Sequence, residues 1–476
     1  MLQTLRNAWH TKEIRAKIFF TLFILLLYRL GTVIPVPFVN AQTFADSLGG
    51  TILAYMNTLS GGSLGQATLF ALGVSPYINA SIIMQLLGVV WPKLGEMAKN
   101  DRAKMNFITR CVTVVLAIVT ALGYYFLLAR GNAFSIEVTE GATWFYAIVI
   151  VACYVAGASI IMWLADRINE RGIGNGISMI LFANIISEIP SFVYNLVNLV
   201  IGTYSYENAW LYGILSTLFA ILLLAALVAL IAFVVFVTGS ERRIPVQYAK
   251  KVVGRKMYGG QSTNLPIKLN MTGVMPIIFA SSLVSLIPTI LMFAGVTATS
   301  EGFWGGLYRV LAADGVVYPV SLFLLIIGFA YFYTTITFDP MEVANNLKRQ
   351  GGAIPGIRQG RPTADYIRKI LNKVTFVGAL FLGVIAILPT VAGPHGIQHI
   401  VSWILRGGVD LSGVSEGLRS FYEQIYSQQI ASTASSLTGV FTFGGTTLLI
   451  VVGVAIETYQ QLEAQLTMRN YKGFLN

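Results

Sequence analysis

The chain has 476 residues, of which 55% are hydrophobic and only 11% are charged. No soluble core accounts for this composition, which excludes an ordinary soluble enzyme and indicates a protein embedded in a membrane. The formal net charge is +11 at neutral pH, and the two cysteines, Cys111 and Cys153, lie inside apolar segments, where we expect them to be buried and unpaired.

Ten apolar segments are long enough to cross a membrane as helices, because about 18 apolar residues suffice. They lie near residues 18–36, 74–91, 106–128, 144–164, 177–200, 211–237, 271–294, 316–337, 374–392 and 439–457. Five fall on each side of a division near residues 205–210, and an odd number per half requires the second half to be inverted. We therefore expect an all-α polytopic membrane protein with ten transmembrane helices, in two inverted five-helix halves (1–205 and 206–476) around a central pore.

The basic residues are concentrated in alternate connections between these segments. Of the 32 Lys and Arg residues, 26 lie in the two terminal segments and in the loops after the second, fourth, sixth and eighth spans. The loops after the odd-numbered spans, which lie on the other side of the membrane, hold 4. By the positive-inside rule, both termini and the basic loops face the cytoplasm. A general nucleic-acid-binding surface is the weaker interpretation of this charge.

The segment 57–73, which precedes the second span, is too short and glycine-rich to cross a membrane but too apolar for an ordinary loop. Its apolar side chains need burial against other parts of the protein, and its glycines allow bends. These apolar residues and glycines are Leu59, Gly61, Gly62, Leu64, Gly65, Leu69 and Phe70. We expect a short half-helix that folds back into the outer mouth of the protein, and an amphipathic surface loop is the alternative.

Residues 73–81, at the start of the second span, echo residues 273–281 of the seventh, with six of nine positions identical. The basic loop follows the first of these spans and precedes the second, so the two helices are expected to be antiparallel. They carry Val74, Ile78 and Ile278 where a solute carrier would place polar ligands. An apolar constriction can close a pore by dewetting and suits large, varied cargo. Ordinary helix packing is the alternative.

Ionisable groups are nearly absent from the middles of the spans. Arg29, Glu188 and Glu457 lie close enough to span ends to reach an interface or a polar neighbour. The sequence contains no nucleotide-binding loop, nucleophile elbow or metal-ligand spacing. We therefore expect no enzyme activity, no metal and no cofactor, and any energy for transport would come from outside the chain.

Two basic loops, 238–270 and 338–373, are long enough to fold. Alternation from residue 243 to 248 predicts a strand in a hairpin. The second loop predicts a helix over 341–350 that ends at glycines, followed by a tight exposed tip over 355–362. One interpretation is that such loops merely determine topology or contact lipids. The more specific interpretation is that they form a docking surface for an anionic partner.

Several motifs together resemble the SecY family, the central subunits of bacterial protein-conducting translocons. They lie at residues 71–87, 171–178, 242–250, 261–266, 339–342, 355–358 and 443–450. The resemblance covers nearly the whole chain. It implies a channel that translocates unfolded polypeptides across the bacterial cytoplasmic membrane and releases hydrophobic segments sideways into lipid.

Site residues follow from the resemblance position by position. The implied pore ring is Val74, Ile78, Leu181, Ile185, Ile278 and Ile450. The segment 57–72 would be the plug, and spans 2, 3, 7 and 8 would form a lateral gate that includes Asn79, Ile82 and Leu286. The implied docking residues are Arg242, Arg243, Lys250, Lys251, Arg255, Lys256, Arg358 and Arg361.

The implied partners are the SecE and SecG subunits, the SecA motor, the ribosome through its RNA, signal peptides with the polypeptides that follow them, and anionic lipids. The external segment 393–437 is longer than the family usually has, and one or two amphipathic helices on the outer surface are expected there.

Two other functions are alternatives to the channel. A secondary transporter predicts polar side chains at the midplane, and a passive scaffold predicts neither a plug nor long basic tips.

Overall fold

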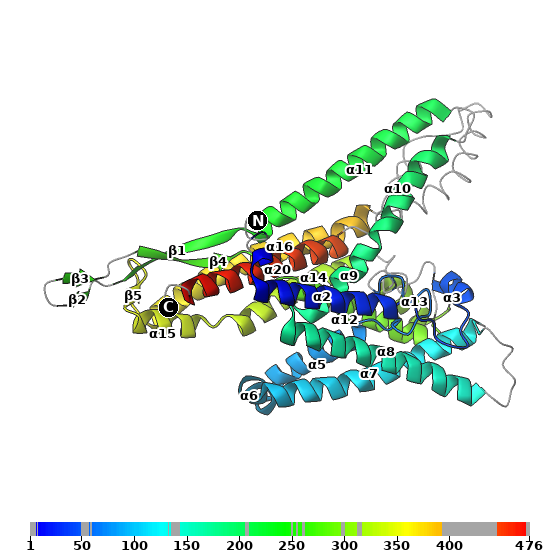
Figure 1. Cartoon of the computed structure of the whole chain (residues 1–476), viewed down its shortest axis with the longest axis horizontal. Coiled ribbons are helices and arrows are strands. Elements are labelled where there is room, and N and C mark those ends of the chain that lie inside the picture. The colour runs from blue at the N-terminus through cyan, green and yellow to red at the C-terminus, as the bar shows by residue number, and fades with distance from the viewer. Residues whose placement is uncertain are drawn as a thin grey trace.

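The computed structural model describes residues 6, 8–48, 57, 60–131, 133–134, 143–204, 209–248, 251–253, 256–258, 262–296, 300–311, 317–392 and 445–472. Most of the longer helices lie roughly along the long axis of the molecule (Figure 1). The helices up to residue 204 are α2 (Lys12–Gly31), α3 (Ala41–Leu48), α5 (Ser75–Val90), α6 (Pro92–Asn100), α7 (Arg102–Arg130), α8 (Thr143–Arg171), α9 (Gly176–Ser187) and α10 (Ile189–Tyr204). Those from residue 209 are α11 (Ala209–Thr238), α12 (Met275–Phe293), α13 (Phe303–Leu311), α14 (Val317–Thr337), α15 (Pro340–Arg349), α16 (Arg361–Ala392) and α20 (Thr446–Lys472).

Each of the ten predicted spans coincides with helix in the described chain. Within the described residues, seven helices could cross a membrane by length and composition, or eight if α5 and α6, bent by 118°, form one span. The fifth predicted span is divided into α9 and α10 at Glu188, because Pro190 in the first turn of α10 supplies no backbone N–H. The protein is thus a multi-pass membrane protein, and the total of ten crossings stays a prediction.

The two echo segments begin their helices in the same way. Gly73 and Gly273 both have left-handed backbone, with φ of +56° and +64°. Val74 and Val274 are the N-cap residues that follow, and a proline lies in the first turn of both α5 and α12. Proline fits there because its missing N–H would have no intrahelical partner. The sequence echo therefore corresponds to a repeated local structure.

The two basic loops fold together at one end of the molecule. Their strands are β1 (Glu241–Tyr248), β2 (Lys251–Val253), β3 (Lys256–Tyr258), β4 (Ser262–Lys268) and β5 (Gly352–Ala353). A three-stranded antiparallel sheet has the order β4-β1-β5, and β2 pairs with β3. Ile244 and Val246 of β1 are 2% and 1% exposed and pack against residues of β4, α15 and α16. The predicted hairpin is confirmed, as is the helix that ends before Gly351.

The strands of the basic loops lie on the side of the helices where α2 begins and α20 ends (Figure 1). The amine of Lys17 near the start of α2 lies 3.3 Å from Oε1 of Gln465 in α20, and Lys268 of β4 lies 2.6 Å from Oε1 of Gln460. Helix α7, whose last residue is Arg130, runs toward the opposite side (Figure 1). This arrangement agrees with the predicted charge asymmetry.

Candidate functional site

The six residues of the predicted ring come together where α5, α9, α12 and α20 meet. Each is at most 4% exposed, and all belong to one hydrophobic cluster. They are Val74, Ile78, Leu181, Ile185, Ile278 and Ile450. Their convergence shows that residues up to 376 positions apart in the sequence form one apolar contact region.

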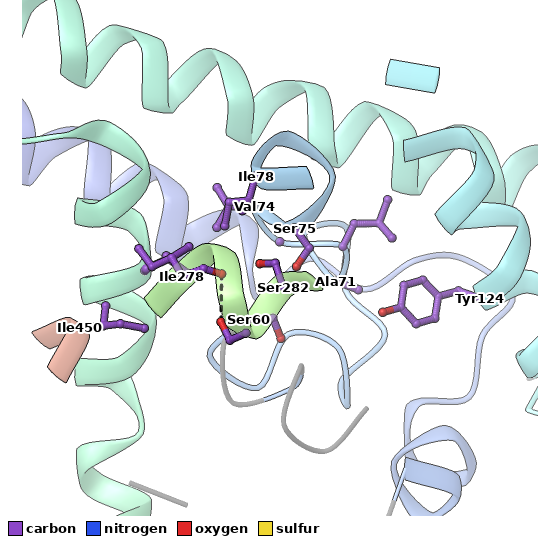
Figure 2. A pocket seen from close by; sticks show the side chains of 13 residues that line it. Ser60, Ala71, Val74, Ser75, Ile78, Tyr124, Ile278, Ser282 and Ile450 are labelled. Atoms are coloured by element: carbon purple, nitrogen blue, oxygen red, sulfur yellow. Dashed lines mark hydrogen bonds between the residues drawn. The ribbon is translucent and has the colours of Figure 1, made fainter. Parts of the chain in front are cut away.

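A small cavity lies beside these side chains (Figure 2). Five of the six line it, whereas Ile185 is buried in the same cluster without facing it. The cavity has a volume of about 20 Å³, which is room for about one water molecule. Aliphatic side chains and serines such as Ser75 and Ser282 together form its wall.

Val274 belongs to the same buried cluster and was missed by the sequence reasoning. It packs against Gly453 of α20, where a Cβ would lie 2.7 Å from a Val274 methyl. In the alignment of residues 73–81 with 273–281, Val274 corresponds to Val74, which was assigned to the ring. The sequence therefore contained the signal that could have identified Val274.

The predicted plug is buried, but it is not the half-helix that we expected. Residues 60–73 form consecutive turns, with left-handed backbone at Gly61, Gly62, Ala67 and Gly73. Left-handed residues interrupt the helical hydrogen-bond pattern. Instead, the segment pairs with the residues that follow α2, through hydrogen bonds from Leu69 N to Ile34 O (2.9 Å) and from Val36 N to Ala67 O (3.1 Å). The expected half-helix is therefore wrong for these residues.

Helices α2 and α8 cover the apolar side chains of this segment. Phe70 stacks on Tyr28 with ring centroids 5.5 Å apart and lies directly over Gly31, where no Cβ would fit. The carbonyl oxygen of Leu69 lies against Gly157 in the same way. Leu64 is 1% exposed. The surface-loop alternative is therefore wrong, and Leu59 lies outside the described residues.

The segment also forms part of the cavity wall. Ser60, Ala71, Leu72 and Gly73 line it together with five of the ring side chains. Gly61 approaches Arg29 of α2 so closely that a Cβ would lie 3.0 Å from Nη1. The Arg29 guanidinium donates a hydrogen bond to the carbonyl of Ala183 in α9, so this charge within the predicted first span has the polar neighbour that we expected.

The three predicted gate residues have different surroundings. Ile82 of α5 is buried in the ring cluster, whereas Asn79 of α5 and Leu286 of α12 are half-buried. One polar link that the sequence reasoning missed joins α5 to α14, where the Tyr333 hydroxyl donates a hydrogen bond to Oε1 of Gln85. Only the fold could reveal this pair, because its members are 248 positions apart.

The predicted docking residues lie on the folded basic loops. Arg242, Arg243, Arg358 and Arg361 are exposed, and Arg243 forms an ion pair of 2.7 Å with Glu241. Lys251 and Lys256 lie on the paired strands β2 and β3. Lys250 and Arg255 lie outside the described residues, as does the segment 393–437.

The tip that carries Arg358 is ordered by turns. Gly356 and Gly360 have left-handed backbone, and the Thr363 hydroxyl donates a hydrogen bond to the Arg358 carbonyl at 2.8 Å. Because β5 pairs with β1, the two basic loops share one sheet.

Among the described residues, no group of three or more His, Cys, Asp or Glu side chains could hold a metal ion.

Comparisons with known proteins agree with this architecture. A family model described as SecY matches residues 68–411. The chain is 39% identical, over an alignment of 493 positions, to the protein translocase subunit SecY of Streptomyces coelicolor. It is also 39% identical over 492 positions to that of Mycobacterium tuberculosis, and both alignments cover 100% of each chain.

Solved structures have the same fold at lower sequence identity. A structure described as a protein conducting channel aligns with a TM-score of 0.61 and 18% identity, covering 94% of this chain and 92% of the other. A SecY structure whose plug domain is described as stabilising the closed state aligns with a TM-score of 0.59 and 19% identity over the same shares. On these grounds, and above all on the full-length identity to its relatives, the chain belongs to the SecY family.

Proposed function

We propose that this chain is a protein-conducting channel that passes unfolded polypeptides across a membrane and releases hydrophobic segments sideways into lipid. The observation that carries the proposal is the convergence of six buried aliphatic side chains, five of which line a cavity of about 20 Å³ together with residues of the segment 60–73. The names of the relatives support it, since both are protein translocase subunits.

An apolar ring suits this task for a physical reason. Aliphatic side chains offer no hydrogen bonds or charges to a passing chain, so they bind no particular sequence. When they meet, they exclude water and therefore ions. We assign the ring role to Val74, Ile78, Leu181, Ile185, Ile278 and Ile450. The segment 57–72, which is largely buried over residues 60–72, is the plug that supports the ring from the outer side.

The lateral gate in this proposal consists of α5, α7, α12 and α14. A signal segment would enter between them and bury its apolar face against these helices and lipid. That burial is worth about 25 cal/mol per Å² of apolar area, and it opens the gate because the closed state offers no such contact. Asn79, Ile82 and Leu286 are the gate residues of the proposal.

The folded basic loops are the proposed docking surface for the SecA motor and for the ribosome. Lys and Arg side chains suit both acidic protein surfaces and RNA phosphates. A canine ribosome–channel complex contains a Sec61 chain with the same fold, at a TM-score of 0.57 and 17% identity. Either partner would supply the energy for transport. The SecE and SecG subunits, with anionic lipids, are proposed to cover apolar side chains such as Leu222 and Phe236 on α11, which are 67% and 73% exposed.

The proposed location is the bacterial cytoplasmic membrane, with both termini and the basic loops in the cytoplasm. The concentration of Lys and Arg in the terminal segments and in alternate loops supports this orientation. The two halves of the channel in this proposal are residues 1–205 and 206–476, and the segment 393–437 faces outward.

Conductance of the purified protein in lipid bilayers tests the channel. Replacing Ile278 with Asn puts an amide among the ring side chains, which lets water enter, and we expect the ion conductance of the idle protein to rise at least severalfold. Ile287→Asn on the same helix is the matched control, because Ile287 is 48% exposed and outside the ring. Low conductance in Asn variants of Ile78, Ile278 and Ile450 alike would refute the channel.

A further inference from the structure

The outer end of α12 is closed by its own backbone. Gly295 has φ of +88°, its N–H donates to the carbonyl of Met292, and the N–H of Val296 donates to that of Leu291, both at 2.9 Å. This pair of bonds is a Schellman motif, which satisfies inner carbonyls at a helix end. The carbonyls of the last residues, Phe293 and Ala294, remain available to another element.

Helix α7 supplies the donor for these carbonyls. The Arg130 guanidinium lies 3.3 Å from the carbonyl oxygen of Phe293 and 3.5 Å from that of Ala294. A positive charge is favourable at this position because the C-terminus of a helix carries the negative end of its dipole. Arg130 is therefore placed to hold the outer end of α12 against the outer end of α7.

A second contact lies one to two turns away on α7. The Phe293 ring rests on Gly123, where a Cβ would lie 2.2 Å from the nearest ring carbon. Tyr124 meets the same ring edge-on, with centroids 5.3 Å apart and an angle of 76° between the planes. Only glycine at position 123 leaves room for this ring. Phe293 is thus seated in a niche that α7 provides.

Tyr124 also belongs to the plug region. It is 2% exposed and lines the cavity together with Ala71 and Leu72 of the plug segment. Figure 2 shows its ring at the edge of that cavity. One buried cluster contains Tyr124, the plug residue Leu64 and the α12 residue Met292. A single side chain therefore contacts the outer end of α12 and faces the plug.

We propose that Gly123, Tyr124 and Arg130 form a latch on the outer end of α12, and that Tyr124 couples release of this latch to release of the plug. The inference rests on the proposed lateral gate, which α7 and α12 form together. When α12 moves away, Phe293 leaves its niche and Tyr124 loses the ring that holds it. The plug then loses part of its cover, so the gate and the plug open together.

Thiol labelling of the plug tests this coupling without any transport step. The assay uses the full chain in lipid bilayers, with Cys111→Ser and Cys153→Ala, and with Ser60→Cys as the reporter. Ser60 is 5% exposed, so a water-soluble maleimide should label it slowly. We expect Phe293→Ala and Gly123→Ala each to raise the labelling rate about tenfold, which corresponds to about 1.4 kcal/mol lost from the closed state.

Arg130→Gln provides a variant with little risk of misfolding, because Arg130 is exposed, and it should raise labelling by a smaller factor. Gly328→Ala is the matched control, since a Cβ there meets no atom within 4 Å. The double variant Gly123→Ala/Phe293→Ala should label no faster than Phe293→Ala alone, because the two residues share one contact.

Two results would overturn the coupling. One is unchanged Ser60 labelling in Gly123→Ala and Arg130→Gln. The other is additive increases in the double variant. Neither depends on whether the ring conducts ions, so failure of the latch can be told apart from failure of the channel itself.

Discussion

Two glycines determine where the plug segment can lie. A Cβ at Gly31 would lie 2.0 Å from the Phe70 ring, and one at Gly157 would lie 1.9 Å from the Leu69 carbonyl oxygen. A ring can turn aside, but a carbonyl moves only with its backbone. Gly157 is therefore the stricter of the two positions.

Replacing Gly157 with Ala should displace the plug. Overpacking of this kind costs about 1–3 kcal/mol, and we expect a higher ion conductance of the idle protein and a lower melting temperature. Gly328→Ala, measured beside it, should behave as the parent chain does. A Gly157→Ala protein that stays as tight as its parent would show that the plug position does not depend on this contact.

At the residue scale, the six positions predicted for the ring from the family resemblance are buried together, whereas some of the residues around them were not predicted. The contact between Tyr124 and Phe293 could not be predicted, because residues 169 positions apart do not affect the local hydrophobic pattern of the sequence. Cys111 was expected to be buried and is exposed, since it lies on an outward face of α7.

At the scale of elements, long apolar helices and the β1 hairpin were predictable because their signals are local. Apolar length predicts the helices, and alternation predicts the strand. The plug was predicted as a helix and forms turns, because its conformation depends on pairing with residues 34–36. That partner lies in another part of the chain, and composition alone does not reveal it.

The basic sheet gives a prediction at this scale. Arg358→Glu reverses one charge on the exposed tip, and we expect motor-driven export to fall at least tenfold while insertion of hydrophobic segments continues. Lys93→Glu is a suitable control, because Lys93 is exposed on α6 at the same end of the molecule but outside the sheet. Both activities can be followed in the same vesicles. Normal export by Arg358→Glu would remove the docking role.

At the scale of the whole molecule, the polar contacts that the described residues make across the proposed gate include the Tyr333–Gln85 hydrogen bond, between α14 and α5, and those of Arg130 in α7 with the end of α12. Apolar packing supplies most of the remaining contact. Such an interface can separate for a hydrophobic helix, because lipid and apolar side chains are nearly equivalent surroundings.

Tyr333→Phe should therefore make the gate easier to open. Loss of one hydrogen bond weakens the closed state by about 0.5–1.5 kcal/mol, so segments of lower hydrophobicity should be inserted. A graded series of Leu/Ala model segments measures this threshold. Tyr331→Phe is the control, because its hydroxyl bonds to the Asn372 carbonyl, on the same side of the gate. Coincident insertion curves for the two variants would contradict a gating role for Tyr333.

The small cavity beside the ring also bears on protons, which cross membranes by hopping along files of hydrogen-bonded water. A space of about 20 Å³ holds about one water molecule. Two hydroxyls in its wall already donate to backbone carbonyls, Ser60 to Asn57 and Ser281 to Ile278. With aliphatic side chains also in its wall, this space has no room for a second water among the described residues. In the proposed channel, such a constriction would limit the leak of protons as well as that of other ions.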